Sequence, residues 1–393
     1  MSTRILDEAM EIQDEIFRNR RYIHQNAEVG LELPKTVAYV KEQLESYGYE
    51  PQEMGGGVVC LLGQGSPVLM LRADMDALPQ EEVTGLDYAC KDGACHSCGH
   101  DAHTAIMLGV AKLLKAHESE LKGTVKILFQ PGEETLYGGA NMVKAGVMEN
   151  PHVDAAVALH IAFGPCGPYN MTPGYMVSMN AMSSADCFKI TVKGKACHGS
   201  MPFTGVSPLV SAADVIRAIV DIPVQKVAAY DPAVISVGEV HGGSAVNIIP
   251  DTCEIGGNIR TFNAKTRELC KDELVRTAEA AAAVNGATVQ VEFFDGVGAI
   301  NNDPELNREL VEYSAEVCKG FTAADKVMSS DDFSAYGDCG IPLAYAYLCC
   351  GGPAQGVMGI NHNPSAVYDE SALPYGTAAL VNFSLKWLEK HSC

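Results

Sequence analysis

The feature that most constrains this chain is a series of short apolar runs in its first half, separated by segments with helical periodicity. The runs are GVVCLLG (57–63), PVLMLRA (67–73), TVKILFQ (124–130) and DAAVALH (154–160). Continuous apolar runs of this length are typical of strands buried on both faces of a mostly parallel sheet. Between them, the segments 103–121 and 138–149 repeat apolar residues at intervals of three and four, which predicts helices. We therefore predict an α/β domain whose ligands lie at the carboxyl ends of the strands.

A different pattern begins near residue 183. The segment DCFKITVKG (186–194) alternates polar and apolar residues, as a strand with one solvated face does. The following segments are typical of a helix (207–222), two strands (233–240 and 252–262), a long helix (264–284) and a strand (287–294). The order β-α-β-β-α-β predicts a ferredoxin-like α+β domain, with its helices on one face of an antiparallel sheet.

The α/β pattern returns from about residue 297. We expect a helix at 304–319, a strand at 342–348 and a closing helix at 370–390. The prediction is therefore one domain formed by residues 1–182 and 297–393, with a second domain, residues 183–296, inserted into it.

Charge and cysteine content argue against several classes of protein. The chain has 49 acidic and 28 basic side chains and a formal net charge of −21, whereas nucleic acids and anionic membrane surfaces bind clustered Lys and Arg. No apolar run reaches the ~18 residues of a membrane span, and segment 1–20 is a charged amphipathic pattern without the apolar centre of a signal peptide. We expect a folded cytoplasmic protein with no nucleic-acid or membrane partner. Its 14 cysteines are few for this length, so most should be reduced thiols.

The densest cluster of potential metal ligands is CKDGACHSCGHDAH (90–103), with three Cys and three His in fourteen positions. Thiolate and imidazole bind zinc and other late first-row divalent ions, so a metal site is the first hypothesis. Two alternatives use the same residues. Cys90, Cys95 and Cys98 have the C-x4-C-x2-C spacing of plant-type iron-sulfur ligation, and they could also form a structural zinc site. Simple burial of the cysteines beside loop histidines is the third possibility.

Two adjacent carboxylates, Glu133 and Glu134, follow the apolar run 124–130 after a Pro-Gly pair. A solvated acidic turn would explain an isolated pair of this kind. Here the strand looks buried and the turn is sharp, so one glutamate could bind metal while the other takes a proton from water. The next strand ends at His160, and the motif NHNP places His362 in a late loop. Single histidines are most often hydrogen-bonding residues, but two of them at the edges of the predicted site favour ligation.

Eight motifs, in order along the chain, carry a resemblance to a known family. They are RADMDALP (72–79), CGHDAH (98–103), FQPGEE (129–134), LH (159–160), GKACHGSMPFTGVSP (194–208), NIIPD (247–251), DDFS (331–334) and NHNP (361–364). Together they resemble the M20 metallopeptidase family, specifically the amidohydrolase branch with hippurate hydrolase, N-acyl-amino-acid amidohydrolases and auxin-conjugate hydrolases. Each motif alone is weak, whereas eight in the same order over nearly the whole chain identify the family.

The resemblance implies a site for two divalent metal ions, with Zn, Mn and Ni all open. It implies that Cys98 bridges the two ions, that Glu133 is the general base, and that Asp74 orients a metal ligand from behind it. Other branches of the family have a His ligand where this chain has Arg72, and His100 would substitute for it. The full set of implied ligands is Cys98, His100, Glu134, His160 and His362.

The resemblance also implies an activity, a metal-dependent hydrolysis of the amide bond in N-acyl amino acids such as hippurate. His198, from the inserted domain, would stabilise the oxyanion, and Asn247 and Arg260 would bind the substrate carboxylate. For Arg260, an ordinary surface charge on a strand is equally compatible with the pattern. The inserted domain would serve as a lid and as the interface of a homodimer, and His198 could act in its own chain or in the partner chain.

Departures from the family pattern leave substrate preference open. Where the family often shows GGHAAMPH, this chain has ACHGSMPF, so that Cys197 stands beside His198 and Phe203 replaces a His. In DDFS, Asp331 replaces a Glu. A dipeptidase or carboxypeptidase would use the same two-metal site and differ in pocket shape. An iron-sulfur electron carrier using Cys90, Cys95 and Cys98 is the alternative from a different class.

Overall fold

A computed structural model describes residues 2–165 and 169–392, and these form two compact units. The large unit contains the chain up to Asn180, Asn301–Lys326 and the chain from Asp332 onward. The inserted unit contains Ala181–Ile300 and the short return segment Val327–Asp331. The sequence had suggested that the return segment belongs with the first domain, whereas it packs with the inserted one.

A nine-stranded sheet organises the large unit. Its strands, in spatial order, are β1 (Gln52–Met54), β2 (Gly57–Gly63), β4 (Thr124–Gln130), β3 (Val68–Asp74), β5 (Ala155–Ala162), β15 (Leu343–Cys349), β6 (Tyr175–Met182) and β13 (Ile300–Asn301), with β14 (Gly320–Val327) paired to β6. The central strands β4, β3, β5 and β15 are parallel, while β2 and β6 pair with them antiparallel. Every residue of β3 and β4 is buried, as their continuous apolar runs predicted.

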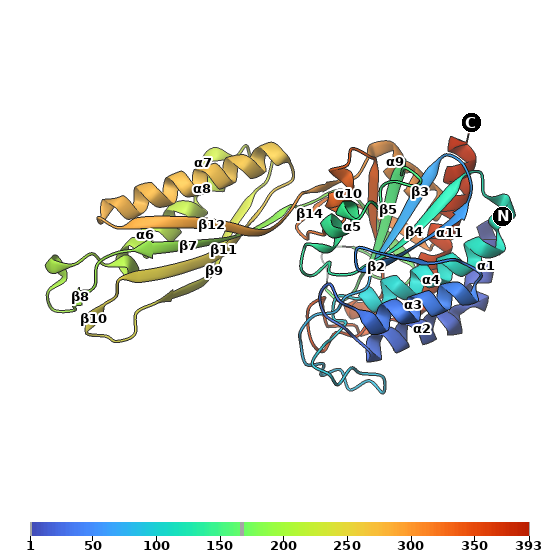
Figure 1. Cartoon of the computed structure of the whole chain (residues 1–393), viewed down its shortest axis with the longest axis horizontal. Helices are drawn as coiled ribbons and strands as arrows, with labels where there is room; N and C mark the ends of the chain where they lie inside the picture. Colours follow the sequence, from blue (N-terminus) through green and yellow to red (C-terminus); the bar gives the residue numbers. More distant parts are fainter. Residues whose placement is uncertain (1, 166–168, 393) are drawn as a thin grey trace. The chain divides into compact units, whose positions relative to one another are not determined.

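Helices cover this sheet (Figure 1). They are α1 (Ser2–Glu11), α2 (Gln13–Gln25), α3 (Pro34–Ser46), α4 (His100–Ala116), α5 (Gly138–Lys144), α9 (Pro304–Ser314), α10 (Ser334–Gly337) and α11 (Leu373–His391). The helices α4 and α11 pack against each other and on β3, and they are buried along most of their length because their apolar residues extend around the helix. The parallel strands therefore end at an edge where the start of α4 also lies, which is where an open α/β sheet holds its ligands.

The inserted unit has a separate four-stranded antiparallel sheet in the order β12-β7-β11-β9. Its strands are β7 (Ala185–Lys193), β9 (Val234–Gly242), β11 (Thr252–Arg260) and β12 (Thr288–Val297), and its helices are α6 (Pro208–Val220), α7 (Ile222–Lys226) and α8 (Ala264–Val284). Phe188, Ile190 and Leu274 belong to the core between sheet and helices. A small ribbon of β8 (Cys197–His198) and β10 (Ile248–Ile249) extends this unit. The predicted α/β class with an inserted ferredoxin-like α+β layer is confirmed.

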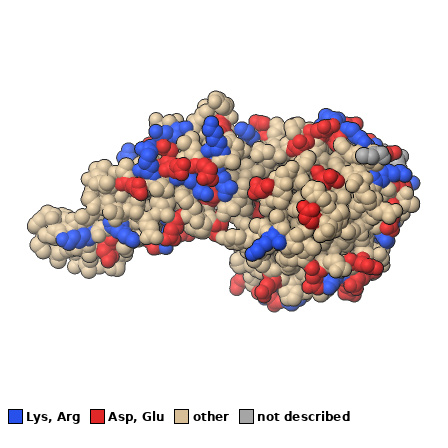
Figure 2. Space-filling model, turned by 45° about the horizontal axis from the view of Figure 1, so that its top comes forward, with Lys and Arg blue, Asp and Glu red and all other residues tan. Residues whose placement is uncertain are grey.

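Short 3-10 turns complete the secondary structure, at Glu118–Glu120, Pro202–Thr204, Pro353–Gln355 and Glu370–Ala372. Within the described residues, no helix is both long and apolar enough to cross a bilayer. On the face shown in Figure 2, Lys and Arg side chains are interspersed with Asp and Glu.

Candidate metal centre

The five predicted ligands converge at the carboxyl edge of the parallel strands. His100 is the first residue of α4, and Cys98 lies two residues before it. Glu134 follows β4, His160 lies in β5 and His362 follows β15. Their ligand atoms fall into groups whose members all lie within 4.8 Å of one another: Cys98 with His100 and His160, Cys98 with Glu134 and His362, and His100 with Glu133 and Glu134. Cys98, His100 and Glu134 each belong to two of these groups, so these three side chains have positions that suit a ligand shared by two ions.

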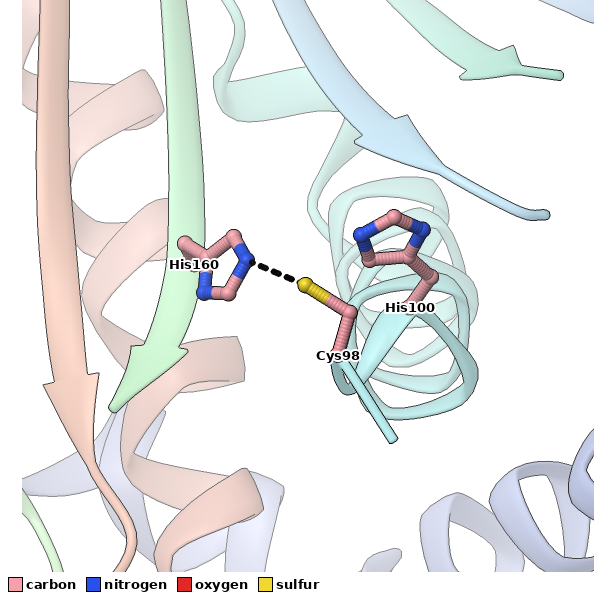
Figure 3. Close-up of side chains that lie close together, drawn as sticks. All are labelled: Cys98, His100 and His160. Atoms are coloured by element: carbon pink, nitrogen blue, oxygen red, sulfur yellow. Dashed lines mark hydrogen bonds between the residues drawn. The ribbon is translucent and has the colours of Figure 1, made fainter. Parts of the chain in front are cut away.

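Cys98 lies at the centre of the cluster. Its Sγ is 3.4 Å from Nε2 of His160, and the sulfur lies between the rings of His160 and His100 (Figure 3). Burial raises the pKa of this thiol to about 12. A thiolate at neutral pH therefore needs a strong neighbouring cation, and a coordinated metal ion deprotonates a thiol outright.

Gly99 lets Cys98 and His100 approach β5. Its backbone is left-handed, with φ +106°, a conformation that costs a side chain free energy. A Cβ at this position would also lie 2.5 Å from Cδ1 of Ile161, the residue after His160. Only glycine fits between the start of α4 and the end of β5.

Two of the three candidate imidazole ligands, His100 and His160, have Nδ1 bonded to a backbone carbonyl. Nδ1 of His100 lies 2.8 Å from the carbonyl oxygen of Asp76, and Nδ1 of His160 lies 2.6 Å from the carbonyl oxygen of Ile161. Because a carbonyl only accepts, each Nδ1 carries a proton, and Nε2 is the nitrogen left to face the cluster and to bind a metal ion. Burial and the neighbouring His103 hold the pKa of His160 well below its ordinary value, which keeps that ring neutral.

Two buried acceptor atoms at the centre lack hydrogen bonds. They are Nε2 of His100 and Oε1 of Glu134, which lie 3.9 Å apart; the same Oε1 is 3.3 Å from Nε2 of His362, an ion-pair contact without hydrogen-bond geometry. Buried polar atoms normally find partners, so unpaired lone pairs that face one another are best satisfied by cations. Burial would raise the pKa of Glu134, but His362, 3.3 Å away, and His100 bring it below its ordinary value. The donor set of one thiol, three imidazoles and a carboxylate fits two late first-row divalent ions.

The Asp76 carboxylate holds the backbone of Glu133 and Glu134. Asp76 was not among the functional residues predicted from the sequence. Its Oδ1 accepts the backbone N–H of Glu133 at 2.9 Å and its Oδ2 accepts that of Glu134 at 3.0 Å. Glu133 itself is buried, with Oε2 3.7 Å from Nε2 of His100. A signal was available, because Asp76 follows Asp74 by two positions at a strand end, where alternate side chains point to the same side.

Asp74 acts on the cluster through His103. Its Oδ1 lies 2.6 Å from Nδ1 of His103, whose Nε2 accepts the backbone N–H of Ile161 at 2.8 Å. Both nitrogens of His103 are thereby used, so this second histidine of the CGHDAH motif has no lone pair left for a metal. The other carboxylate oxygen, Oδ2, accepts from Arg72 at 2.7 Å and lies 3.8 Å from Nε2 of His100, beyond hydrogen-bond distance. The expected ligand-orienting contact is thus indirect, through the backbone that follows His160.

A second buried network supports the start of α4. Asp101 accepts from Arg20 at 2.7 Å and from His24 at 2.8 Å, and all three side chains are buried. Burial would raise the pKa of Asp101, but Arg20 and His24 hold it far below its ordinary value. Asp101 adjoins His100 in sequence, so this network anchors the turn that carries a ligand.

Cys90 and Cys95 do not join Cys98. In the part of the chain that the structure describes, no group of Cys, His, Asp and Glu close enough to hold an ion contains either residue. Cys90 packs with Ala27, Ala77 and Ala94. The geometry therefore does not support the iron-sulfur or zinc-ribbon alternatives.

The three remaining predicted residues lie in the inserted unit. His198 and Asn247 are neighbours in the β8–β10 ribbon, where Gly199 donates its N–H to the Asn247 carbonyl at 2.8 Å. Arg260 ends β11 and donates to Ser330 Oγ at 2.6 Å. Among the described residues no carboxylate forms an ion pair with Arg260, although the side chain is partly buried. Burial lowers its pKa from the ordinary value, and an anionic ligand would offset that cost.

Comparison with known proteins identifies the family of this chain. Residues 70–386 match the model of peptidase family M20/M25/M40. The chain is 32% identical over 397 residues to thermostable carboxypeptidase 2 of Saccharolobus solfataricus, covering 98% of this chain and 99% of that protein. It is 33% identical over 373 residues to N-acetyl-L-cysteine deacetylase of Bacillus subtilis, covering 92% and 85%. The crystal structure of the Bacillus subtilis YXEP protein, described as a dinuclear metal binding peptidase, aligns with a TM-score of 0.81 and 28% identity, covering 97% of this chain and 99% of that one. The chain therefore belongs to peptidase family M20/M25/M40 and is a metal-dependent hydrolase of amide bonds.

Proposed function

We propose that this hydrolase cleaves the amide bond of N-acyl amino acids, with hippurate-like compounds as the substrate class. The observation that carries the proposal is Glu133, a buried carboxylate whose Oε2 lies 3.7 Å from Nε2 of His100, beside the five residues proposed as ligands. A site that only stored metal would have no use for such a group. The relative from Bacillus subtilis, an N-acetyl-L-cysteine deacetylase by name, supports an N-acyl substrate.

Cys98, His100, Glu134, His160 and His362 would hold the two ions, with Cys98 shared between them. When bound, such ions supply Lewis acidity toward the scissile carbonyl and toward water, whose pKa falls from ~15.7 toward ~7. The chain offers mixed sulfur, nitrogen and oxygen donors, which zinc, manganese and nickel all accept to different degrees.

Glu133 would accept the proton of the attacking water and then deliver it to the leaving amine. The Asp76 carboxylate accepts the backbone N–H of Glu133, and this bond would hold the Glu133 side chain in position beside the reacting atoms. A positioned general base of this kind contributes about 10²- to 10⁴-fold to the rate.

The inserted unit would bind the other parts of the substrate. His198 would donate a hydrogen bond to the developing oxyanion, and Asn247 and Arg260 would bind the carboxylate of the amino-acid part. The partly buried guanidinium of Arg260, without an ion-pair partner among the described residues, supports this role because Arg binds carboxylates through paired N–H groups. We further propose that the enzyme is a homodimer in which the inserted domain forms the interface.

A carboxypeptidase activity is the second candidate, favoured by the relative of that name from Saccharolobus solfataricus. The test is a panel of hippurate, N-acetyl-L-cysteine and unblocked dipeptides, assayed after loading with Zn²⁺, Mn²⁺ or Ni²⁺. Turnover of the acylated compounds well above the dipeptides supports the proposal. Faster cleavage of dipeptides would contradict it, and Glu133→Gln protein controls for contaminating hydrolases.

A further inference from the structure

A tight turn follows His198 in the inserted unit. Within it, the Met201 N–H donates to the His198 carbonyl at 2.8 Å. The turn brings Ser200 back to the imidazole, where the Ser200 backbone N–H donates to Nδ1 of His198 at 3.2 Å. The Ser200 hydroxyl oxygen lies 2.8 Å from the same nitrogen. The backbone N–H and the hydroxyl of Ser200 thus both contact Nδ1 of His198.

These contacts decide which nitrogen of His198 carries the proton. A backbone N–H can only donate, so Nδ1 must present its lone pair to it. A proton on Nδ1 would face that N–H and lose this bond, which leaves Nε2 as the protonated position. With Nδ1 accepting, the Ser200 hydroxyl must also donate rather than accept. The described residues offer no hydrogen-bond partner to Nε2, and His198 is exposed, so the Nε2–H is available to a ligand.

Gly199 allows the backbone of the His198 strand to lie close to the backbone of Asn247. A Cβ on Gly199 would lie 2.9 to 3.2 Å from backbone atoms of Asn247, too close without displacing the ribbon. The missing side chain lets the Gly199 N–H reach the Asn247 carbonyl, and it keeps His198 in register with Ile248. His198 and Asn247 are therefore held as one module, with Ser200 as the only side chain bonded to the imidazole among the described residues.

We propose that Ser200 is a positioning residue that fixes His198 as the Nε2–H tautomer and so prepares it to donate to an oxyanion. The proposal rests on the oxyanion role proposed above for His198. The tautomer itself is a property of the free protein, so it can be tested without any assumption about activity.

The first experiment measures the tautomer by ¹⁵N NMR on holoenzyme labelled at histidine, with His198 assigned by its loss in His198→Ala protein. In wild type, Nδ1 is expected at an acceptor-type shift and Nε2 at a protonated shift. Ser200→Ala should move the tautomer ratio by about two- to twelvefold, the effect of losing one hydrogen bond. Ser200→Thr keeps the hydroxyl and should restore the ratio. A proton on Nδ1 in the wild type would overturn the proposal, as would a ratio that Ser200→Ala leaves unchanged.

The second experiment is a double-mutant cycle with hippurate as substrate. Ser200→Ala should lower kcat by about two- to twelvefold with KM and metal content unchanged, and it should have no effect in a His198→Ala background. Thr204→Ala is the matched control, because that hydroxyl bonds the Met201 carbonyl in the same turn but not His198. An equal loss in the His198→Ala background, or from Thr204→Ala, would reject the positioning role. If His198→Ala itself leaves kcat unchanged while the NMR result holds, the oxyanion role fails and the tautomer assignment stands.

Discussion

Replacing Asp76 by Asn should weaken metal binding although Asp76 is not a ligand. Its two carboxylate oxygens accept the N–H groups of Glu133 and Glu134 at 2.9 and 3.0 Å. Asn offers one oxygen and one NH₂ group in the same shape, so one backbone N–H would lose its acceptor and face a second donor. Because Asp76 is fully buried, water cannot easily repair the loss.

The magnitude follows from the bond that is lost. A hydrogen bond to a charged group contributes about 1.5–3 kcal/mol, and each ~1.4 kcal/mol corresponds to tenfold in an equilibrium constant. In Asp76→Asn, the turn at 133–134 would shift to separate the Asn NH₂ group from the backbone N–H that it faces. The free energy of the lost hydrogen bond would then be subtracted from the free energy of metal binding. We expect the metal dissociation constant to rise by about 10- to 100-fold, the usual effect of removing a partner behind a metal ligand.

Chelator competition on purified protein measures this dissociation constant, and urea unfolding of the same samples monitors stability. Asp303→Asn is the matched control, since one oxygen of Asp303 accepts the N–H groups of both Glu305 and Leu306 at the start of α9. Asn keeps such an acceptor, so the control loses charge without losing the bonds. Metal affinity within twofold of wild type in Asp76→Asn would refute the reasoning, as would an equal loss in the control.

Three further substitutions test the centre. Glu133→Gln should retain both ions by elemental analysis but lower kcat by about 10²- to 10⁴-fold, and activity within a few-fold of wild type would exclude Glu133 as the base. Cys98→Ala should lower metal content, because it removes the sulfur donor that lies among the other candidate ligands; unchanged metal content by elemental analysis would exclude Cys98 as a ligand. Asp101→Asn should lower the free energy of unfolding by about 3–5 kcal/mol at pH 7, because it leaves Arg20 buried without this partner. Since the pKa of Asp101 is depressed in the folded chain, the difference from wild type should persist above pH ~4 and shrink as the pH falls below it; a difference independent of pH would contradict the electrostatic explanation.

Regular periodicity made much of the fold predictable. The buried strands β3, β4 and β5 are continuous apolar runs, and runs of this length are typical of strands buried on both faces of a parallel sheet. The residues that the sequence missed are those whose role depends on distant contacts. Arg20 and Asp101 are 81 positions apart, and nothing near either residue indicates that they pair in the core. His100 and His103 both belong to the CGHDAH motif, and the contacts of His103 distinguish them, because one of its ring nitrogens is bonded to Asp74 and the other to the Ile161 N–H.

Arg72 shows how the cluster works without a histidine at that position. A guanidinium has no acceptor and cannot bind a cation, so its charge must be balanced within the buried edge of the sheet. Arg72 donates to Asp74 at 2.7 Å, to Gln130 at 3.0 Å and to Asp332 at 2.9 Å. Asp74 is thus bonded to Arg72 through Oδ2 and to His103 through Oδ1. The unpaired Nε2 of His100 is then the imidazole acceptor that faces Glu134, which is why the substitution at position 72 is compatible with a two-metal site.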